Sequence, residues 1–154
     1  MSLYHQFEAL EATPIGDGIK TSVWLFPAIE AVHLLALAVL GGAILMLDLR
    51  LLGLGLTSHP ASSVEREARP WLIGALVVMV ITGGLLGLSE ALKLYDKPAF
   101  WVKMVALAFA LAFTFAVKAP LAHRGPGWAA RPLAAVSLAL WLTVAIAGRW
   151  IGFS

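Results

Sequence analysis

The chain has 154 residues, of which 60% are hydrophobic and 13% are charged, whereas a soluble domain has about 45–50% apolar and about 25% charged residues. This composition excludes an ordinary soluble domain. The formal net charge is +2, and the basic residues stand singly near the ends of apolar blocks, as headgroup anchors do, so nucleic-acid binding is not indicated. The chain has no cysteine, which excludes disulfides, thiolate metal sites, iron–sulfur clusters and covalently attached haem.

Residues 1–22 precede the first apolar block and are polar to mixed in character. We do not expect a cleaved signal peptide, because the segment is polar and the block that follows is longer than a signal-peptide core. Leu3, Tyr4, Phe7 and Leu10 are spaced for one face of a short helix. The segment is therefore predicted to lie at the membrane interface.

The first apolar block, residues 23–47, exceeds the roughly 20 residues that a bilayer core requires. Asp48 and Arg50 follow it and are predicted to close the helix. A long connector then follows, because residues 57–69 are rich in charged residues and contain a proline and two serines.

A proline opens each of the next three predicted spans, as prolines do at the first turn of a helix. Pro70 is predicted to open a span over residues 70–89, and Pro98 one over residues 98–118 that Lys118 closes. Residues 132–153 form the last predicted span. The sequence thus predicts one all-α membrane domain over residues 1–154, a bundle of four transmembrane helices.

Alanines at four-residue spacing in the third span, Ala108, Ala112 and Ala116, form a smooth stripe. Such stripes allow helices in lipid to approach closely, so we predict that a neighbouring helix packs against this one.

Basic residues are slightly more frequent at one side of the predicted bundle. The two longer connections are flanked by Arg50, Arg66, Arg69, Lys118, Arg124 and Arg131, and the opposite side carries Lys20, Lys93, Lys97, Lys103 and Arg149. The bias predicts that the longer connections are cytoplasmic and that both termini face the periplasm.

Glu30 and His33 interrupt the first span, and titratable groups inside a span are costly enough to suggest a function. Their spacing of three residues places them on one helix face, which we expect to look into the bundle. Three hypotheses remain open for His33: it is an axial ligand of haem b, it binds a metal or moves protons together with Glu30, or it makes a structural hydrogen bond to another helix. In the metal hypothesis Glu90 is the other carboxylate near a span.

Glu30, Glu90, Lys103 and Arg149 are all predicted to lie toward one membrane face. Lys103 and Arg149 are placed there to pair with haem propionates, or they pair with the two glutamates or extend to the interface. A second axial ligand is not evident. His59 and His123 follow the far ends of their helices, which leaves His5, Lys103 or the His33 of a second copy.

Four segments carry a resemblance to an uncharacterised bacterial family of small four-helix membrane proteins, and the resemblance covers nearly the whole chain. They are residues 27–33 (PAIEAVH), 47–53 (LDLRLLG), 100–103 (FWVK) and 148–153 (GRWIGF). More distantly, the chain resembles the HemJ-type protoporphyrinogen oxidases and the membrane domain of copper-resistance protein D. That likeness implies haem b or copper handling in a bacterial inner membrane, with His33 and Lys103 as the equivalent positions. Thr114 stands where the HemJ-type pattern has a further histidine.

The leading hypothesis from the sequence is a membrane-embedded b-type haem protein in electron transfer or a small oxidoreductase reaction. His33 is then the iron ligand, and Lys103, Arg149 and Glu30 complete the cofactor site. A second copy of the chain or a membrane redox partner is the expected partner beside the lipid. The alternative is a non-enzymatic protein, such as a metal or proton conduit or an accessory subunit, with a buried ionic or metal site that includes Glu30 and Glu90.

Overall fold

The computed structural model describes residues 3–124 and 127–153, and every regular element in these ranges is helical. Four helical segments are long and apolar enough to cross a membrane. They are α3 (Leu25–Leu52), α4 (Ala61–Ser89), the continuous run Pro98–Arg124, and α8 (Ala130–Ile151). The predicted all-α bundle of four membrane helices is confirmed.

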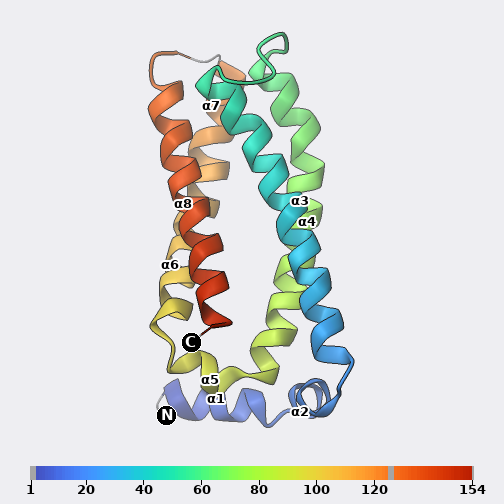
Figure 1. Ribbon diagram of the computed structural model, residues 1–154. Helices are drawn as coiled ribbons and strands as arrows, with labels where there is room; N and C mark the ends of the chain where they lie inside the picture. The colour runs from blue at the N-terminus through green and yellow to red at the C-terminus, as the bar shows by residue number, and fades with distance from the viewer. Residues whose placement is uncertain (1–2, 125–126, 154) are drawn as a thin grey trace.

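The four segments run antiparallel to their chain neighbours, and both termini lie at the same end (Figure 1). We call this the termini end and the opposite one the loop end. α3 packs mainly against α4, the third segment packs mainly against α8, and α3 also contacts α8. These contacts make α3 and α8 neighbours in the bundle.

The third segment consists of α6 (Pro98–Phe113), the π-helical turn η1 (Thr114–Lys118) and α7 (Ala119–Arg124). Pro98 stands at the first turn of α6, as predicted. The segment does not end at Lys118, because helical structure continues to Arg124. The π turn shifts the faces of the helix at this point, and such turns are frequent at functional sites.

The prediction that Pro70 opens the second span was wrong, because α4 begins at Ala61 and Pro70 lies inside it. The first turns of α4 are held by packing: Ala61, Val64 and Ala68 are buried at helical spacing, and the charged side chains between them point mainly outward. The helix is therefore longer than the apolar run. A helix of this length exceeds the roughly 30 Å thickness of a hydrocarbon core.

The first span also continues beyond its predicted end, since α3 runs to Leu52. Gly53 terminates it in the left-handed conformation with φ of 78°, and its N–H bonds back to the carbonyl of Arg50. A glycine adopts this conformation without strain. Asp48 is consequently an interior residue of the helix. At the fourth span the difference is smaller, because α8 begins at Ala130 rather than Pro132.

Two short helices, α1 (Leu3–Glu11) and α2 (Pro14–Thr21), lie across the termini end beside α5 (Ala91–Tyr95) (Figure 1). The Thr13 hydroxyl caps α2 by accepting from the N–H of Gly16 at 3.2 Å. Gly16 lies so close to α4 that an added Cβ would stand 2.7 Å from the carbonyl oxygen of Leu88. Only glycine permits this approach of α2 to α4.

An ion pair and an aromatic cluster attach these helices to the bundle. Glu11 pairs with Lys20 and accepts from the backbone N–H of Leu92 at 2.8 Å. The Lys20 ammonium and then the Leu92 N–H hold the pKa of Glu11 below its ordinary value, and the Glu11 carboxylate raises the pKa of Lys20. The Phe7 ring contacts the rings of Tyr95, Phe100 and Trp101. Residues at this end thus meet from α1, α5 and α6.

The predicted packing stripe on the third span was wrong. Ala108, Ala112 and Ala116 are exposed on the outer side of the bundle. The alanines that pack against α8 are Ala106 and Ala110, which form a buried cluster with Val144. The stripe was one helix face away from the true contact, because alanines occur on several faces of this helix.

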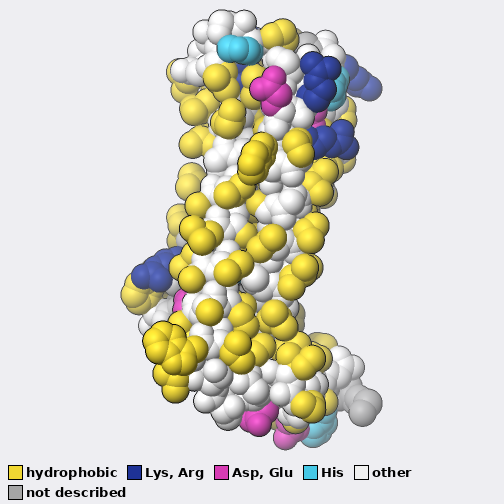
Figure 2. All heavy atoms as spheres, turned by 90° about the vertical axis from the view of Figure 1, so that its right-hand side faces the viewer, with side chains coloured by type: hydrophobic (Ala, Val, Ile, Leu, Met, Phe, Trp, Pro, Cys, Tyr) yellow, Lys and Arg dark blue, Asp and Glu magenta, His cyan; other side chains and the backbone are white. Residues whose placement is uncertain are grey.

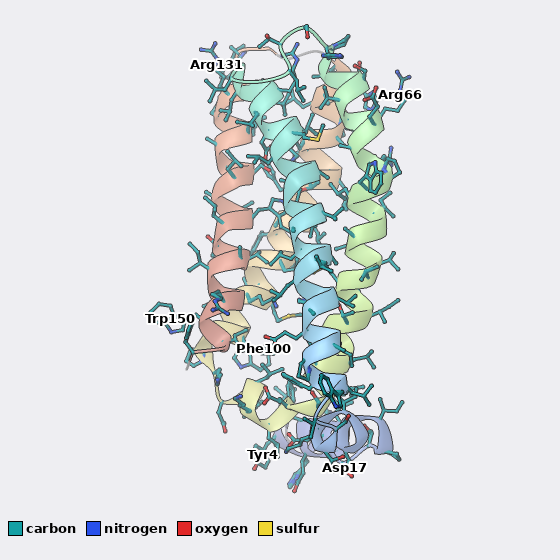
Figure 3. All side chains as sticks on the ribbon, turned by 45° about the vertical axis from the view of Figure 1, so that its right-hand side comes forward. Tyr4, Asp17, Arg66, Phe100, Arg131 and Trp150 are labelled. Carbon is teal, nitrogen blue, oxygen red and sulfur yellow. The ribbon has the colours of Figure 1, made fainter. Side chains whose placement is uncertain are left out.

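Apolar side chains cover the middle of the molecule, and the charged side chains gather toward its two ends (Figure 2). Arg66 and Arg131 lie at the loop end, whereas Tyr4 and Asp17 lie at the termini end (Figure 3). This distribution is that of a protein with a central apolar belt and two polar caps, as a bilayer requires.

Candidate functional site

The interior of the bundle near the termini end contains His33. Its side chain is half-buried and faces α4, where its Nδ1 lies 2.8 Å from the hydroxyl of Thr82. An added Cβ on Gly83 would stand 3.2 Å from the Cε1 of His33. The missing side chain at Gly83 thus makes room for the imidazole ring.

The hydroxyl of Thr82 fixes the tautomer of His33. Thr82 donates its one hydrogen to the carbonyl of Val78 at 2.7 Å. With that hydrogen donated to Val78, the oxygen accepts from His33, and this arrangement favours the tautomer in which the Nδ1 of His33 carries the hydrogen. The Nε2 of a neutral His33 then has a free lone pair, which is the arrangement found in histidines that ligate iron or another metal.

Lys103 of α6 extends into the same half of the bundle. It lies against α8, where an added Cβ on Gly148 would stand 3.5 Å from the ammonium nitrogen. It is close enough to His33 for the two side chains to interact electrostatically. Within the described ranges Lys103 has no hydrogen bond or ion pair. An ammonium group in an apolar bundle is thus left with unused donors.

These residues form what we call the termini-end site, to which each of the four spans contributes: His33, Thr82, Gly83, Lys103 and Gly148. In this half of the bundle α3 has no buried residue before Ala36 and α6 has none before Ala106, whereas Thr82 and Ser89 of α4 and Ala147 of α8 are buried. The site is thus a group of polar side chains between the helices, of which Thr82 is buried and His33 and Lys103 are half-buried.

Three residues predicted for this site lie elsewhere. Glu30 is exposed on α3, which corrects the expectation that it faces the interior beside His33. Residues three positions apart project about 60° from one another around the helix axis, which is enough to separate the two side chains. Glu90 pairs with Lys93 at 3.0 Å, and exposed Arg149 stacks over the ring of Phe153 at 4.3 Å.

The other histidines have partners away from His33. His5 lies 3.3 Å from Glu8, His59 lies 3.0 Å from Ser58, and His123 lies 3.0 Å from Glu65. Among the described residues, no three or more histidine, aspartate or glutamate side chains are grouped to hold a metal ion. The metal hypothesis with Glu30, His33 and Glu90 therefore lacks a ligand set in a single chain.

A second polar site, near the loop end, was not predicted. Asp48 of α3, Lys118 of η1 and Ser137 of α8 form a closed hydrogen-bonded ring, which we call the buried triad. The ammonium of Lys118 donates to Asp48 Oδ1 and to Ser137 Oγ, both at 3.0 Å, and Ser137 donates to Asp48 Oδ2 at 2.9 Å. Lys118 and Asp48 are each 0% exposed. The triad joins three of the four spans.

A cavity of about 20 Å³ lies beside the buried triad, between α3, α4 and η1. Lys118, Thr114, Glu65 and Arg69 contribute polar groups to its lining. Glu65 is itself buried and accepts from exposed His123 of α7 at 3.0 Å. A row of polar groups therefore leads from the surface at the loop end to the buried triad.

The sequence contained a signal for the buried triad, but we missed it because we interpreted Asp48 and Lys118 as helix ends. Apolar residues continue on both sides of Asp48 and of Lys118, so neither charge coincides with the end of a hydrophobic pattern. The two charges are of opposite sign and stand near the same membrane face in the predicted topology. A pair of this kind favours burial of both, because each compensates the other.

Comparison with known families places the chain. A family model described as a family of unknown function, DUF6644, matches residues 7–154. The chain belongs to this family. Its model covers all four spans and most of α1, so the termini-end site and the buried triad of this DUF6644 protein both lie within the matched region.

No curated protein and no solved structure matches the chain. The expected likeness to an uncharacterised family is thus confirmed, and the comparisons lend no support to the more distant likeness to HemJ-type oxidases or copper-resistance protein D.

Proposed function

We propose that this protein is a membrane-embedded b-type haem protein in which His33 is an axial ligand, and that it acts in electron transfer or a small oxidoreductase reaction. The observation that carries the proposal is the hydrogen bond between His33 and Thr82. With Thr82 donating to Val78 and accepting from Nδ1 of His33, the Nε2 of His33 keeps a free lone pair. A bound haem would supply a one-electron redox centre at this position.

Lys103 of α6, which lies against α8, also supports the proposal. Its ammonium has no carboxylate partner in the described ranges, and it lies in the same half of the bundle as His33. A propionate group would provide that partner through a charge-assisted hydrogen bond. Arg149 is exposed over Phe153, so we assign it a smaller part in holding the cofactor.

The late start of side-chain burial on α3 and α6 also supports a ligand at the termini end. The first buried residues of α3 and α6 are Ala36 and Ala106, which lie three residues, or just under one turn, beyond His33 and Lys103 respectively. No second histidine in the described ranges contacts His33. We therefore propose that the iron's remaining position is open, or is filled by Lys103 or by a residue of a second copy or redox partner.

The cellular setting is part of the same proposal. Four membrane helices and the excess of basic residues at the loop end support a multi-pass protein of a bacterial inner membrane, with both termini in the periplasm. The haem would then lie toward the periplasmic side.

The direct test is the visible absorption spectrum of the purified protein. We expect a Soret band that shifts on reduction, and we expect its loss in His33→Ala. His59→Ala and His123→Ala are matched controls, because both residues lie toward the loop end, and they should retain the band. A colourless wild-type protein from haem-supplied cells, or a normal spectrum in His33→Ala, would overturn the proposal.

A finer test uses the residue that orients the imidazole. Thr82→Val removes the acceptor for Nδ1 and should weaken haem retention by about 10–100-fold, as loss of such partners does at metal sites. Thr82→Ser keeps the hydroxyl and should preserve retention. Lys103→Ala should lower the midpoint potential. Loss of a nearby positive charge stabilises the oxidised haem, which carries one more positive charge, relative to the reduced haem. Equal retention in the valine and serine variants would contradict this role of Thr82.

The second candidate function is a non-enzymatic membrane protein with a buried ionic site. The buried triad favours it, because an ion pair with no exposed surface is costly to retain in a span. A colourless protein with stoichiometric bound zinc, copper or iron would support a metal conduit. A colourless and metal-free protein would leave the accessory-subunit or proton-conduit function.

A further inference from the structure

The cavity beside the buried triad is the right size for one water molecule. Its volume of about 20 Å³ exceeds the ~10–15 Å³ that a single water needs, and a buried water also needs two to four polar partners. Lys118, Glu65 and Thr114 line the cavity and offer such partners. The indole of Trp141 donates to the oxygen of Thr114 at 3.1 Å, so the hydrogen of this hydroxyl is free to be donated.

Lys118 has one hydrogen left for this water. An ammonium group carries three hydrogens, and two of them are donated to Asp48 and Ser137. Within the described ranges no acceptor is bonded to the third, although the side chain is completely buried and lines the cavity. A water accepting this hydrogen would complete its bonding.

On the other side of the cavity, Glu65 connects to the surface. One oxygen of its carboxylate, Oε2, is bonded to His123, and the side chain of His123 is about half exposed (52%). The other oxygen is available to a water in the cavity. The charged groups around the cavity and the triad come from every element packed there: Asp48 from α3, Glu65 and Arg69 from α4, Lys118 from η1 and His123 from α7.

We propose that the cavity holds a water molecule that links Glu65 to Lys118, and that His123, Glu65 and this water form a proton-entry relay to the buried carboxylate of Asp48. The relay ends at Asp48 and does not cross the membrane. Its role does not depend on haem at the termini-end site, which lies in the other half of the bundle.

The number of protons is conserved at each step of the relay. His123 takes a proton from the solvent and passes the hydrogen on Nε2 to Glu65. Lys118 first passes to Asp48 the hydrogen that it donates to it, which leaves a neutral amine, and the amine turns its lone pair toward the water. Glu65 then passes a proton to the water, and the water gives one of its own to the amine. At the end Asp48 is a neutral carboxylic acid, Lys118 is again an ammonium group, and the net change is one proton taken from the solvent. Lys118 is the last residue of the π turn Thr114–Lys118, and it both lines the cavity and donates to Asp48.

The test measures exchange of the Lys118 ammonium hydrogens with solvent, by NMR of full-length protein labelled with ¹⁵N at lysine side chains. The Lys118 signal is identified by its loss in Lys118→Met. Ala68 lines the cavity, so Ala68→Val fills it, whereas Ala75→Val adds the same group to the same face of α4 outside the cavity. Both alanines are buried to a similar degree.

In wild type we expect a magnetisation-transfer peak between water and the Lys118 ammonium. Ala68→Val should remove this peak and slow exchange by about tenfold or more, because exchange then depends on local opening of the helices. Glu65→Gln should slow exchange but keep the water peak. Ala75→Val should match wild type in both measurements.

The proposal is overturned if Ala68→Val and wild type exchange at the same rate, or if Ala68→Val and Ala75→Val are changed equally. The absence of a water peak in wild type would overturn it as well. If Ala68→Val does not fold, Ala43→Val fills the cavity from α3 and replaces it in the comparison.

Discussion

Lys103 and Lys118 lie on the same span, but their surroundings differ. Lys118 is enclosed on all sides and has its charge compensated by Asp48, with Ser137 completing the ring. Lys103 is half-buried and has no such partner in the described ranges. Since an uncompensated charge in an apolar interior is expensive, the first arrangement is stable without a ligand and the second favours the binding of an anion.

Removal of one member of the buried triad should be far more damaging than removal of both charges. Asp48→Val alone, or Lys118→Met alone, leaves a buried charge unpaired and should cost about 3–5 kcal/mol of unfolding free energy. The double variant leaves no unpaired charge, and the hydroxyl of Ser137 is then free to bond within its own helix. We expect it to be more stable than either single variant. Denaturant unfolding in detergent measures all four proteins.

This comparison has its own control. Glu90 and Lys93 also form an ion pair, but both are accessible to solvent, so the Glu90→Gln variant should change stability by less than about 1 kcal/mol. Additive losses in the Asp48 and Lys118 double variant would show that the two charges do not compensate one another.

At the scale of the elements, the alanine faces of α6 decide which neighbours it has. Ala106 and Ala110 face α8, whereas the stripe that includes Ala112 faces outward. The same residue type therefore has different roles two positions apart. A lipid-facing alanine has space for a larger side chain, and a buried one does not.

Ala110→Leu should lower stability by about 1–3 kcal/mol, because Ala110 is 0% exposed and the added volume overfills the contact with Val144. Ala112→Leu, on the outer face of the same helix, should leave the melting temperature nearly unchanged. Thermal unfolding of both variants in one detergent makes the comparison. A lower melting temperature for Ala112→Leu alone would mean that the outer face is the packed one.

The attachment of α1 and α2 should depend on pH. The pKa of Glu11 is lowered in the folded protein, so its contribution is fully present above the ordinary carboxyl pKa and is lost as the pH falls from there through the lowered pKa of the folded state. The pKa of Lys20 is raised, so its contribution is fully present below the ordinary lysine pKa and is lost as the pH rises from there through the raised pKa of the folded state. Attachment should be strongest between these limits.

Hydrogen–deuterium exchange of residues 3–21, corrected for the intrinsic effect of pH, measures this attachment. Exchange should increase on acidification in wild type, and Glu11→Gln should show fast exchange at neutral pH with little further increase in acid. An unchanged acid response in Glu11→Gln would assign the effect to another group.

For the whole molecule, the antiparallel order of four spans determines which connections share a membrane side. Ser62 lies in the first turn of α4 at the loop end, and Asp96 follows α5 at the termini end. The two positions must therefore be separated by the bilayer. The basic residues at the loop end favour its placement in the cytoplasm.

Cysteines introduced at these positions test the topology, since the natural chain has none. Ser62→Cys and Asp96→Cys should react with a membrane-impermeant reagent from opposite sides, and Asp96→Cys should react from the periplasm. Labelling of both from one side would contradict the four-span bundle, and reversed sides would contradict only the orientation.

The sequence alone was sufficient for the class of protein, the number of spans and the polar residue His33. Long apolar blocks can be stable only as membrane helices, and the cost of a titratable group within them makes His33 conspicuous. Both signals are local, because they depend on the residues of one segment. The start of α6 at Pro98 was predictable for the same reason.

Only the tertiary structure decided how these segments meet. Asp48, Lys118 and Ser137 are far apart in the chain, and their compensation of one another becomes visible only when three helices pack together. Packing likewise extends α4 through Pro70, because burial of Ala61, Val64 and Ala68 outweighs the local preference of proline for a first turn. It also separates Glu30 from His33, since small rotations of a helix decide whether a side chain faces the bundle or its surroundings.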